Sequence, residues 1–98
     1  MAAYIVARID VTNPELMKNY LAATPPVLRK YSGKFIARGV PDVTLEGPAE
    51  SRRLVIIEFP DLATATGFFN SPEYTAARKL REGAAIAEFV AINGAENS

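Results

Sequence analysis

Apolar residues along the chain follow two kinds of spacing, one typical of strands and one typical of helices. Four segments are rich in β-branched and aromatic residues and too short for a buried helix, so they predict strands at residues 3–10, 34–38, 53–59 and 86–92. A further run at 43–46 predicts that the second strand resumes beyond Pro41, because proline within a strand indicates an edge or a bulge. The run at 53–59 is the most apolar and suits the centre of a sheet.

The first helical segment begins at Asn13, whose side chain can cap the first turn, and at Pro14, which suits the first helical position. Apolar residues then recur at helical spacing as far as Tyr31, and Gly33 is expected to end the helix in a left-handed conformation. Within this segment, Thr24-Pro25-Pro26 removes two amide donors. The sequence predicts a break there, with the Thr24 hydroxyl accepting a hydrogen bond from an amide of a second helical piece.

Two shorter helical segments follow the central strand. Asp61 caps the first of them, which extends through Phe69. Ser71-Pro72-Glu73 repeats the same start pattern for the second, which extends to about residue 82. Together the two segments form one crossover to the last strand, beyond which a frayed tail is expected.

The elements therefore follow the order β-α-β-β-α-β, which is the split β-α-β or ferredoxin-like arrangement. This α+β fold has a four-stranded antiparallel sheet with its helices on one face. Right-handed crossovers place the strands at 3–10 and 53–59 in the centre. A chain of 98 residues with this order predicts a single domain, residues 1–98.

The sheet face opposite the helices is expected to be uncovered and unusually apolar. Alternation along the strands places on it Val6, Ile36, Leu54, Ile56, Val90 and Ile92. A small monomer rarely leaves so much contiguous apolar area in water, and this chain has no cysteine to form a disulfide. We therefore expect a homodimer in which two such sheets stack face to face.

Charged residues interrupt the same face. If the hairpin between the second and third strands turns about Pro48, Arg38 lies opposite Glu58, and Arg8 flanks the same carboxylate from the neighbouring strand. Two interpretations of this cluster are open. The charges form ion pairs that fix the dimer register, or the arginines receive an anionic ligand while Glu58 acts as a general base.

The amino-acid composition excludes several kinds of partner and active site. Eleven basic and eleven acidic residues give a formal net charge of zero, so neither nucleic acid nor an anionic membrane is an expected partner. The absence of histidine and cysteine excludes a His-ligated haem, a Ser-His-Asp triad and a thiol nucleophile. Oxygen ligands for a metal remain possible, but we predict neither a metal nor a cofactor. The first apolar run ends at Arg8 and Asp10, too short to span a membrane, and a cytoplasmic protein is expected.

Several single residues also have two interpretations. Tyr20, Tyr31 and Tyr74 lie at helical spacing and are typical of core aromatics as well as of catalytic acids. Thr24 is either a cap or a ligand contact, since a broken helix over a sheet often opens a cavity. The glycines are isolated turn residues, so no phosphate-binding loop is predicted.

The chain resembles the domain-of-unknown-function family 1330 (DUF1330), in the dimeric α+β barrel superfamily, over about residues 3–94. The resemblance is carried by AYIVARIDVTNPELMKNY, TPPVLRKYSGKFIARG, RRLVIIEFP and FFNSPEYTAARKLREGAA, in this order. It implies a ferredoxin-like subunit whose sheet packs on that of a second subunit, and it implies no established reaction. The candidate pocket residues that it implies are Tyr20, Thr24, Arg38, Glu58, Ser71 and Tyr74, with no catalytic assignment.

The wider superfamily includes cofactor-independent monooxygenases, isomerases, haem-binding relatives and small stress-induced proteins, and likeness of fold alone is a weak guide among them. Lack of histidine argues against the haem branch. Two hypotheses remain. One is a cofactor-independent enzyme of monooxygenase or isomerase type that binds a small hydrophobic, anionic or oxygenated molecule between helices and sheet. The other is a non-catalytic ligand-binding or stress-related dimer.

Overall fold

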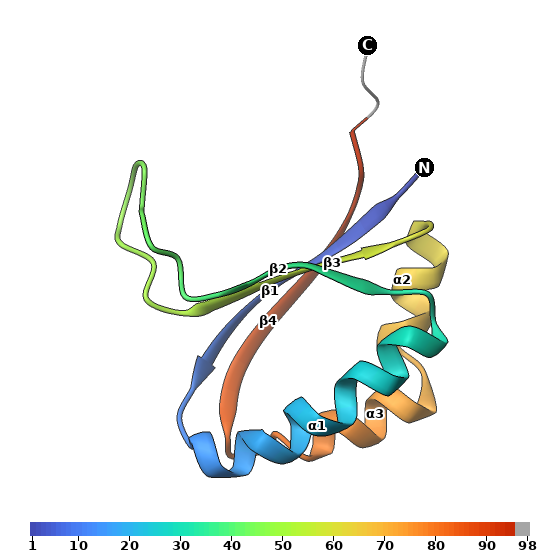
Figure 1. The fold of residues 1–98 in the computed structure, drawn as a ribbon, viewed down its shortest axis with the longest axis horizontal. Helices are drawn as coiled ribbons and strands as arrows, with labels where there is room; N and C mark the ends of the chain where they lie inside the picture. Colours follow the sequence, from blue (N-terminus) through green and yellow to red (C-terminus); the bar gives the residue numbers. More distant parts are fainter. Residues whose placement is uncertain (96–98) are drawn as a thin grey trace.

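A four-stranded antiparallel sheet with three helices on one face forms the structure, a computed structural model that describes residues 1–95 (Figure 1). The elements in chain order are β1 (Ala3–Val11), α1 (Pro14–Lys30), β2 (Lys34–Gly39), β3 (Arg53–Phe59), α2 (Leu62–Phe69), α3 (Pro72–Lys79) and β4 (Ala85–Asn93). The strands lie in the order β2-β3-β1-β4. The α+β, ferredoxin-like fold expected from the sequence is therefore confirmed.

Each helix begins directly after the residue whose side chain was expected to cap it. Asn13 accepts a hydrogen bond from the Leu16 amide at 3.2 Å, and Asp61 accepts one from the Thr64 amide at 2.7 Å. Ser71 caps α3 in the same way, which leaves only a short turn between α2 and α3. These local hydrogen bonds satisfy amides that have no partner within the helix.

The expected break in α1 is wrong, because the helix continues from Pro14 to Lys30 through both internal prolines. The Thr24 hydroxyl does not cap a second piece: it donates to the Tyr20 carbonyl at 2.8 Å, one turn back. Pro25 and Pro26 still supply no amide hydrogens, at a cost on the order of 3 kcal/mol for an interior proline. Burial of Tyr20, Thr24 and Leu28 against the sheet and α3 offsets this loss and keeps the helix in one piece.

The end of α1 also differs from expectation. The left-handed residue is Ser32, with φ 61°, and not Gly33. Glycine is required at 33 for space, since a Cβ there would lie 2.6 Å from Leu28 Cδ1 and 2.7 Å from Phe59 Cε1. Both neighbours are buried in the core, so neither side chain is free to move aside.

A β-bulge in β2 changes which face its last residues occupy. Phe35 pairs with Ile57, but Ala37 pairs with Ile56, so Ile36 is an extra residue in the ladder. As a result, Arg38 aligns with Val55, whose side chain faces the helices. The expected position of Arg38 on the uncovered face is therefore wrong.

The predicted strand at 43–46 is also absent, because those residues lie in the irregular loop between β2 and β3 that projects away from the sheet (Figure 1). At the other end of the chain, β4 includes Asn93, and the Gly94 amide donates to the Ala2 carbonyl at 2.7 Å. The expected fraying therefore does not begin at Asn93. Residues 96–98 lie outside the described residues.

The face opposite the helices carries an apolar row across its middle. Ile56 pairs with Val6, and Val6 pairs with Val90 on the other side. Val90 is 58% exposed, and Ile36 and Ile92 on the same face are 51% and 58% exposed. Residues 1–95 contain no helix long and apolar enough to cross a membrane.

Candidate functional site

A cavity of about 310 Å³ lies between α1 and the helix-facing side of the sheet. Its walls are mostly apolar and include Ala7, Ile9, Val55, Ile57, Phe68 and Phe89. The strand residues reach it because they alternate toward the helices, and Phe68 reaches it from the end of α2. This combination of an apolar wall with a few polar groups is typical of small-molecule sites.

Two tyrosine hydroxyls form a polar point within this apolar wall. Tyr20 on α1 and Tyr74 on α3 both line the cavity, and their hydroxyl oxygens lie 2.5 Å apart. The rings meet edge to face with centroids 6.2 Å apart. Tyr20 is 5% exposed and Tyr74 is 1% exposed, so the pair marks the inner part of the cavity.

Burial keeps the Tyr74 hydroxyl protonated. Loss of solvent raises the pKa of Tyr74 far above its usual range, and the adjacent Tyr20 hydroxyl raises it further, while the Arg81 guanidinium opposes the shift. At physiological pH this hydroxyl stays neutral, so no phenolate is present to act as a base. It donates or accepts a hydrogen bond without losing its proton.

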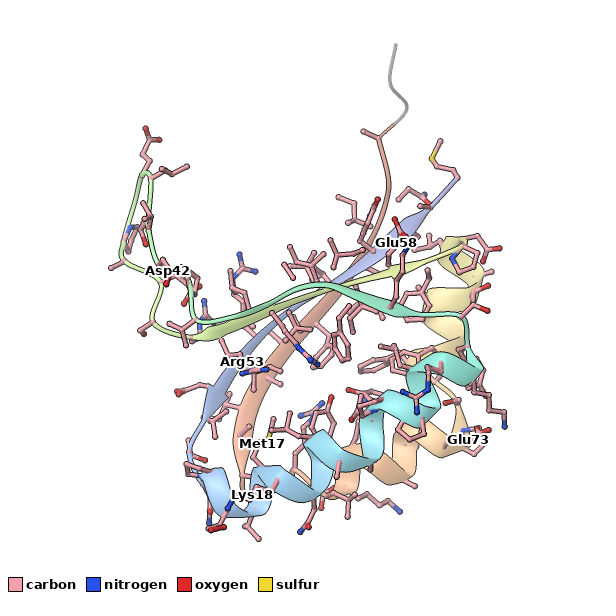
Figure 2. The ribbon with its side chains drawn as sticks, in the orientation of Figure 1. Met17, Lys18, Asp42, Arg53, Glu58 and Glu73 are labelled. Carbon is pink, nitrogen blue, oxygen red and sulfur yellow. The ribbon has the colours of Figure 1, made fainter. Side chains whose placement is uncertain are left out.

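Two arginines give the cavity a positive charge. Arg38 projects from the end of β2 with its guanidinium carbon 4.4 Å from the Phe35 ring centroid. Arg53, the first residue of β3, pairs with Ile9 and lies on the helix side of the sheet (Figure 2). Neither arginine forms an ion pair with any acidic group in residues 1–95. No carboxylate is among the described residues that line the cavity.

Thr24 and Ser71 have structural contacts that explain their burial. Thr24 lines the cavity, but its hydroxyl hydrogen is committed to the Tyr20 carbonyl. Ser71 lies outside the cavity lining: its hydroxyl donates to the Phe68 carbonyl at 2.7 Å and accepts from the Tyr74 amide at 3.0 Å. Ser71 therefore holds the start of α3 and, through it, the position of Tyr74.

Arg8 and Glu58 lie on the opposite face of the sheet, so the expected cluster of Arg8, Arg38 and Glu58 does not form. Glu58 pairs with Lys34 at 3.2 Å and accepts a hydrogen bond from the Tyr4 hydroxyl at 3.2 Å. The expected register was wrong because the hairpin does not turn about Pro48 and because the bulge at Ile36 shifts the ladder. Figure 2 shows Glu58 and Arg53 on opposite sides of the sheet.

The loop between β2 and β3 instead brings a different carboxylate to the uncovered face. Glu50 accepts from Arg52 at 3.0 Å and 3.1 Å and from Arg8 at 3.3 Å, and Arg52 also reaches Glu88 at 2.7 Å. Hydrogen bonding to Arg52 is the main cause that lowers the pKa of Glu50 to about 2. The charged groups on this face therefore flank the apolar row on its two sides, two residues away along the strands, and lie on the far side of the sheet from the cavity.

Of the seven candidate residues, the structure brings Tyr20, Thr24, Arg38 and Tyr74 together at the cavity. The sequence interpretation missed Arg53, although strand alternation with Val55 and Ile57 would have placed it on the helix side. It also did not single out Arg81. That guanidinium lies against the rings of Tyr20 and Phe89, a contact that depends on how the chain turns after α3. Residues 1–95 contain no group of three or more acidic, histidine or cysteine side chains arranged to hold a metal ion.

Comparisons with known proteins place this architecture among uncharacterised and dimeric relatives. Residues 2–95 match the family model described as "Domain of unknown function (DUF1330)". A comparison with the curated proteins finds no match. A protein of unknown function from Rhodopseudomonas palustris is similar in structure, with a TM-score of 0.75 and 21% identity over 98% of this chain and 84% of that chain.

Two further solved structures share the fold at lower identity. The cofactor-independent oxygenase SnoaB from Streptomyces nogalater has a TM-score of 0.70 and 12% identity, covering 98% of this chain and 95% of that chain. A dimeric ferredoxin-like protein of unknown function from Jannaschia sp. CCS1 has a TM-score of 0.67 and 11% identity, covering 96% of this chain and 100% of that chain. At these identities the likeness establishes the fold alone.

Proposed function

Since the chain belongs to the DUF1330 family, whose description states no activity, we propose a function from its site: a homodimer that binds a small apolar anion in the cavity of each subunit. The observation that carries this proposal is the pair of arginines, Arg38 and Arg53, beside an apolar cavity without a carboxylate. A guanidinium that lacks an internal partner is suited to a carboxylate or an enolate from outside. The apolar walls take the body of the same molecule.

The homodimer is supported by the uncovered sheet face. The row formed by Ile56, Val6 and Val90 crosses three strands, and no helix of residues 1–95 covers it. Charged groups on both sides of the row suit the rim of an interface, since their side chains can stay partly in water. The Jannaschia neighbour, described as dimeric, supports the same assembly. A cytoplasmic location stays a prediction.

A thermal-shift titration tests the ligand class. Benzoate and 2-naphthoate are compared with the corresponding amides, which have nearly the same shape and no charge. A ligand that binds only the folded state raises its melting temperature. We expect shifts with the acids and none with the amides, because only the acids pair with the arginines.

Variants of the two arginines complete the test. Arg38→Gln with Arg53→Gln should abolish the shifts caused by the acids, and Arg29→Gln is the matched control because Arg29 lies exposed near the end of α1. The proposed function fails if amides and acids shift the melting temperature equally. It also fails if the double variant responds to acids like the wild type.

A cofactor-independent oxygenase is the second candidate, and likeness to SnoaB together with the positive cavity favours it. A nearby guanidinium lowers the pKa of a bound phenol or enol and so favours its anion, the electron-rich form that reacts with molecular oxygen. The test is oxygen uptake by the protein with a panel of electron-rich phenols and enols. Uptake that the double arginine variant lacks supports the enzyme, whereas binding of the same compounds without uptake favours the non-catalytic alternative.

A further inference from the structure

The hydroxyl pair of Tyr20 and Tyr74 has one hydrogen more than its mutual bond uses. Two hydroxyls carry two hydrogens, and a hydrogen bond between them occupies one, whichever oxygen donates. The hydrogen bonds within residues 1–95 include no other acceptor for either hydroxyl. A buried donor without an acceptor costs about 1–3 kcal/mol. Since both tyrosines line the cavity, its interior is where an acceptor can be supplied.

A positive charge lies behind the same part of the wall. The Arg81 guanidinium carbon is 5.3 Å from the centroid of the Tyr20 ring and 5.3 Å from that of the Phe89 ring, and both rings line the cavity. Its Nε is buried and has no hydrogen-bond partner, and Arg81 forms none of the ion pairs within residues 1–95. An unneutralised charge in a site of low polarity favours negative charge nearby.

The exposure of the polar side chains shows which lie at the opening of the cavity and which lie at its inner end. Arg38 is exposed and marks the open side, whereas Tyr20 and Tyr74 are almost fully buried. A molecule that reaches both ends meets a cation at the opening, an apolar wall along its body and a hydroxyl donor at the inner end.

We propose that the Tyr20–Tyr74 pair, backed by Arg81, forms an inner subsite for an oxygen atom of the ligand. The ligand class is then a flat aromatic acid that carries a phenolic, enolic or carbonyl oxygen at the end opposite its carboxylate. This inference rests on the proposed function for the outer subsite, and it adds the second polar group that the ligand must have. The high pKa of Tyr74 agrees with it, because a protonated pair donates to that oxygen and does not compete as an anion.

Matched pairs of acids test the inner subsite. Dissociation constants are measured by calorimetry for benzoate against 4-hydroxybenzoate and for 2-naphthoate against 6-hydroxy-2-naphthoate, with 2-naphthol as the probe without a carboxylate. We expect the hydroxylated member of at least one pair to bind about tenfold more tightly, the equivalent of one good hydrogen bond.

The decisive variant is the double change Tyr20→Phe with Tyr74→Phe. It removes both hydroxyls and keeps both rings, a replacement that leaves no unpaired donor and is therefore nearly neutral for folding. It should bind the plain acids as the wild type does and lose the tenfold preference for the hydroxylated ones. Binding of the plain acid also shows that the variant is folded.

Arg81→Met tests the charge behind the wall, and Arg78→Met is its matched control. The Arg78 guanidinium carbon lies 4.5 Å from the centroid of the Phe69 ring. Neither Arg78 nor Arg81 lines the cavity. Arg81→Met should reduce the preference for hydroxylated acids severalfold, whereas Arg78→Met should leave it unchanged.

The outcomes separate the two proposals. Equal binding within both pairs of acids overturns the inner subsite and leaves the proposed function standing. A preference for the hydroxylated acids that survives the double tyrosine change has the same consequence. Binding of 2-naphthol without binding of any acid overturns the outer anion site but supports the inner one. If none of the probes binds, both proposals are overturned.

Discussion

The Ser71 hydroxyl accepts a hydrogen bond from the Tyr74 amide at 3.0 Å. The residue that caps α3 therefore lies one helical turn before Tyr74, whose side-chain hydroxyl lies in the inner part of the cavity. The same serine donates to the Phe68 carbonyl at 2.7 Å, which ties the end of α2 to the start of α3. Since Phe68 and Tyr74 also pack with ring centroids 4.5 Å apart, one buried residue positions two walls of the site.

Ser71→Ala should therefore destabilise the protein by about 1–2 kcal/mol, the upper part of the range for loss of an N-cap. Urea unfolding measures the change. Asn13→Ala is the matched control, because Asn13 caps α1 in an exposed position where water can replace the lost bond. Equal losses for the two variants would contradict a special role for the buried cap.

The tyrosine pair predicts non-additive stability changes. Tyr20→Phe alone removes the hydroxyl that pairs with the buried Tyr74 hydroxyl and should cost about 1–3 kcal/mol. The double change to phenylalanine removes both polar groups and should cost less than the sum of the single changes. A double-mutant cycle by chemical denaturation, without ligand, measures this coupling. Strict additivity would show that the two hydroxyls do not depend on each other.

Local patterns in the sequence were sufficient for most of the fold. A helix begins directly after Asn13, Asp61 and Ser71. Each of these side chains accepts a hydrogen bond from an amide only three residues later, so no distant residue is needed to predict these helix starts. Strand alternation likewise placed Leu54 and Ile56 on the uncovered face, and the residues after them, Val55 and Ile57, are buried on the helix side. Such features depend on neighbours along the chain, and this is why they could be predicted.

Two features that shape the site depend on distant contacts and could not be predicted in this way. The helix continues through Pro25 because Tyr20 and Leu28 on either side are buried, and propensity alone does not include that packing. The bulge at Ile36 turns Arg38 toward the cavity, yet nothing at Ile36 itself marks an extra residue. Four candidate residues meet at the cavity, whereas the neighbours of Arg38 were predicted wrongly.

The charged group at Glu50 predicts a dependence of stability on pH. The pKa of Glu50 is about 2 in the folded protein against an ordinary value of 4.5, chiefly because Arg52 donates hydrogen bonds to its ionised form. A carboxyl group whose pKa is depressed by folding stabilises the folded state above its unfolded pKa. That contribution is lost progressively as the pH falls from about 4.5 toward 2.

Glu50→Gln lacks this contribution, so its melting temperature should lie below that of the wild type near neutral pH. The difference should narrow between about pH 4.5 and 2, where the wild type loses the same contribution. Glu46→Gln is the control, since Glu46 is exposed in the same loop and forms none of the ion pairs in residues 1–95. A gap between wild type and Glu50→Gln that stays constant across this range would refute the role of Arg52.

The apolar row on the uncovered face predicts the oligomeric state. Ile56→Asp places a carboxylate in the row on the central strand β3, and burying it against a second sheet without a partner would cost several kcal/mol. We expect a monomer by light scattering at concentrations where the wild type is a dimer. Val90→Asp should have the same effect. Because Val90 is 58% exposed in the subunit, its replacement tests association without disturbing the core of one chain.

Leu16→Asp serves as the control on the other side of the molecule. Leu16 is 44% exposed in the first turn of α1, where an acidic residue suits the helix dipole, so this variant should remain dimeric. If Val90→Asp also remains a dimer, the two sheets do not meet through this face, and the assembly must use another surface. If all three variants become monomeric, the effect follows from added charge and not from its position, which would equally reject the row as the interface.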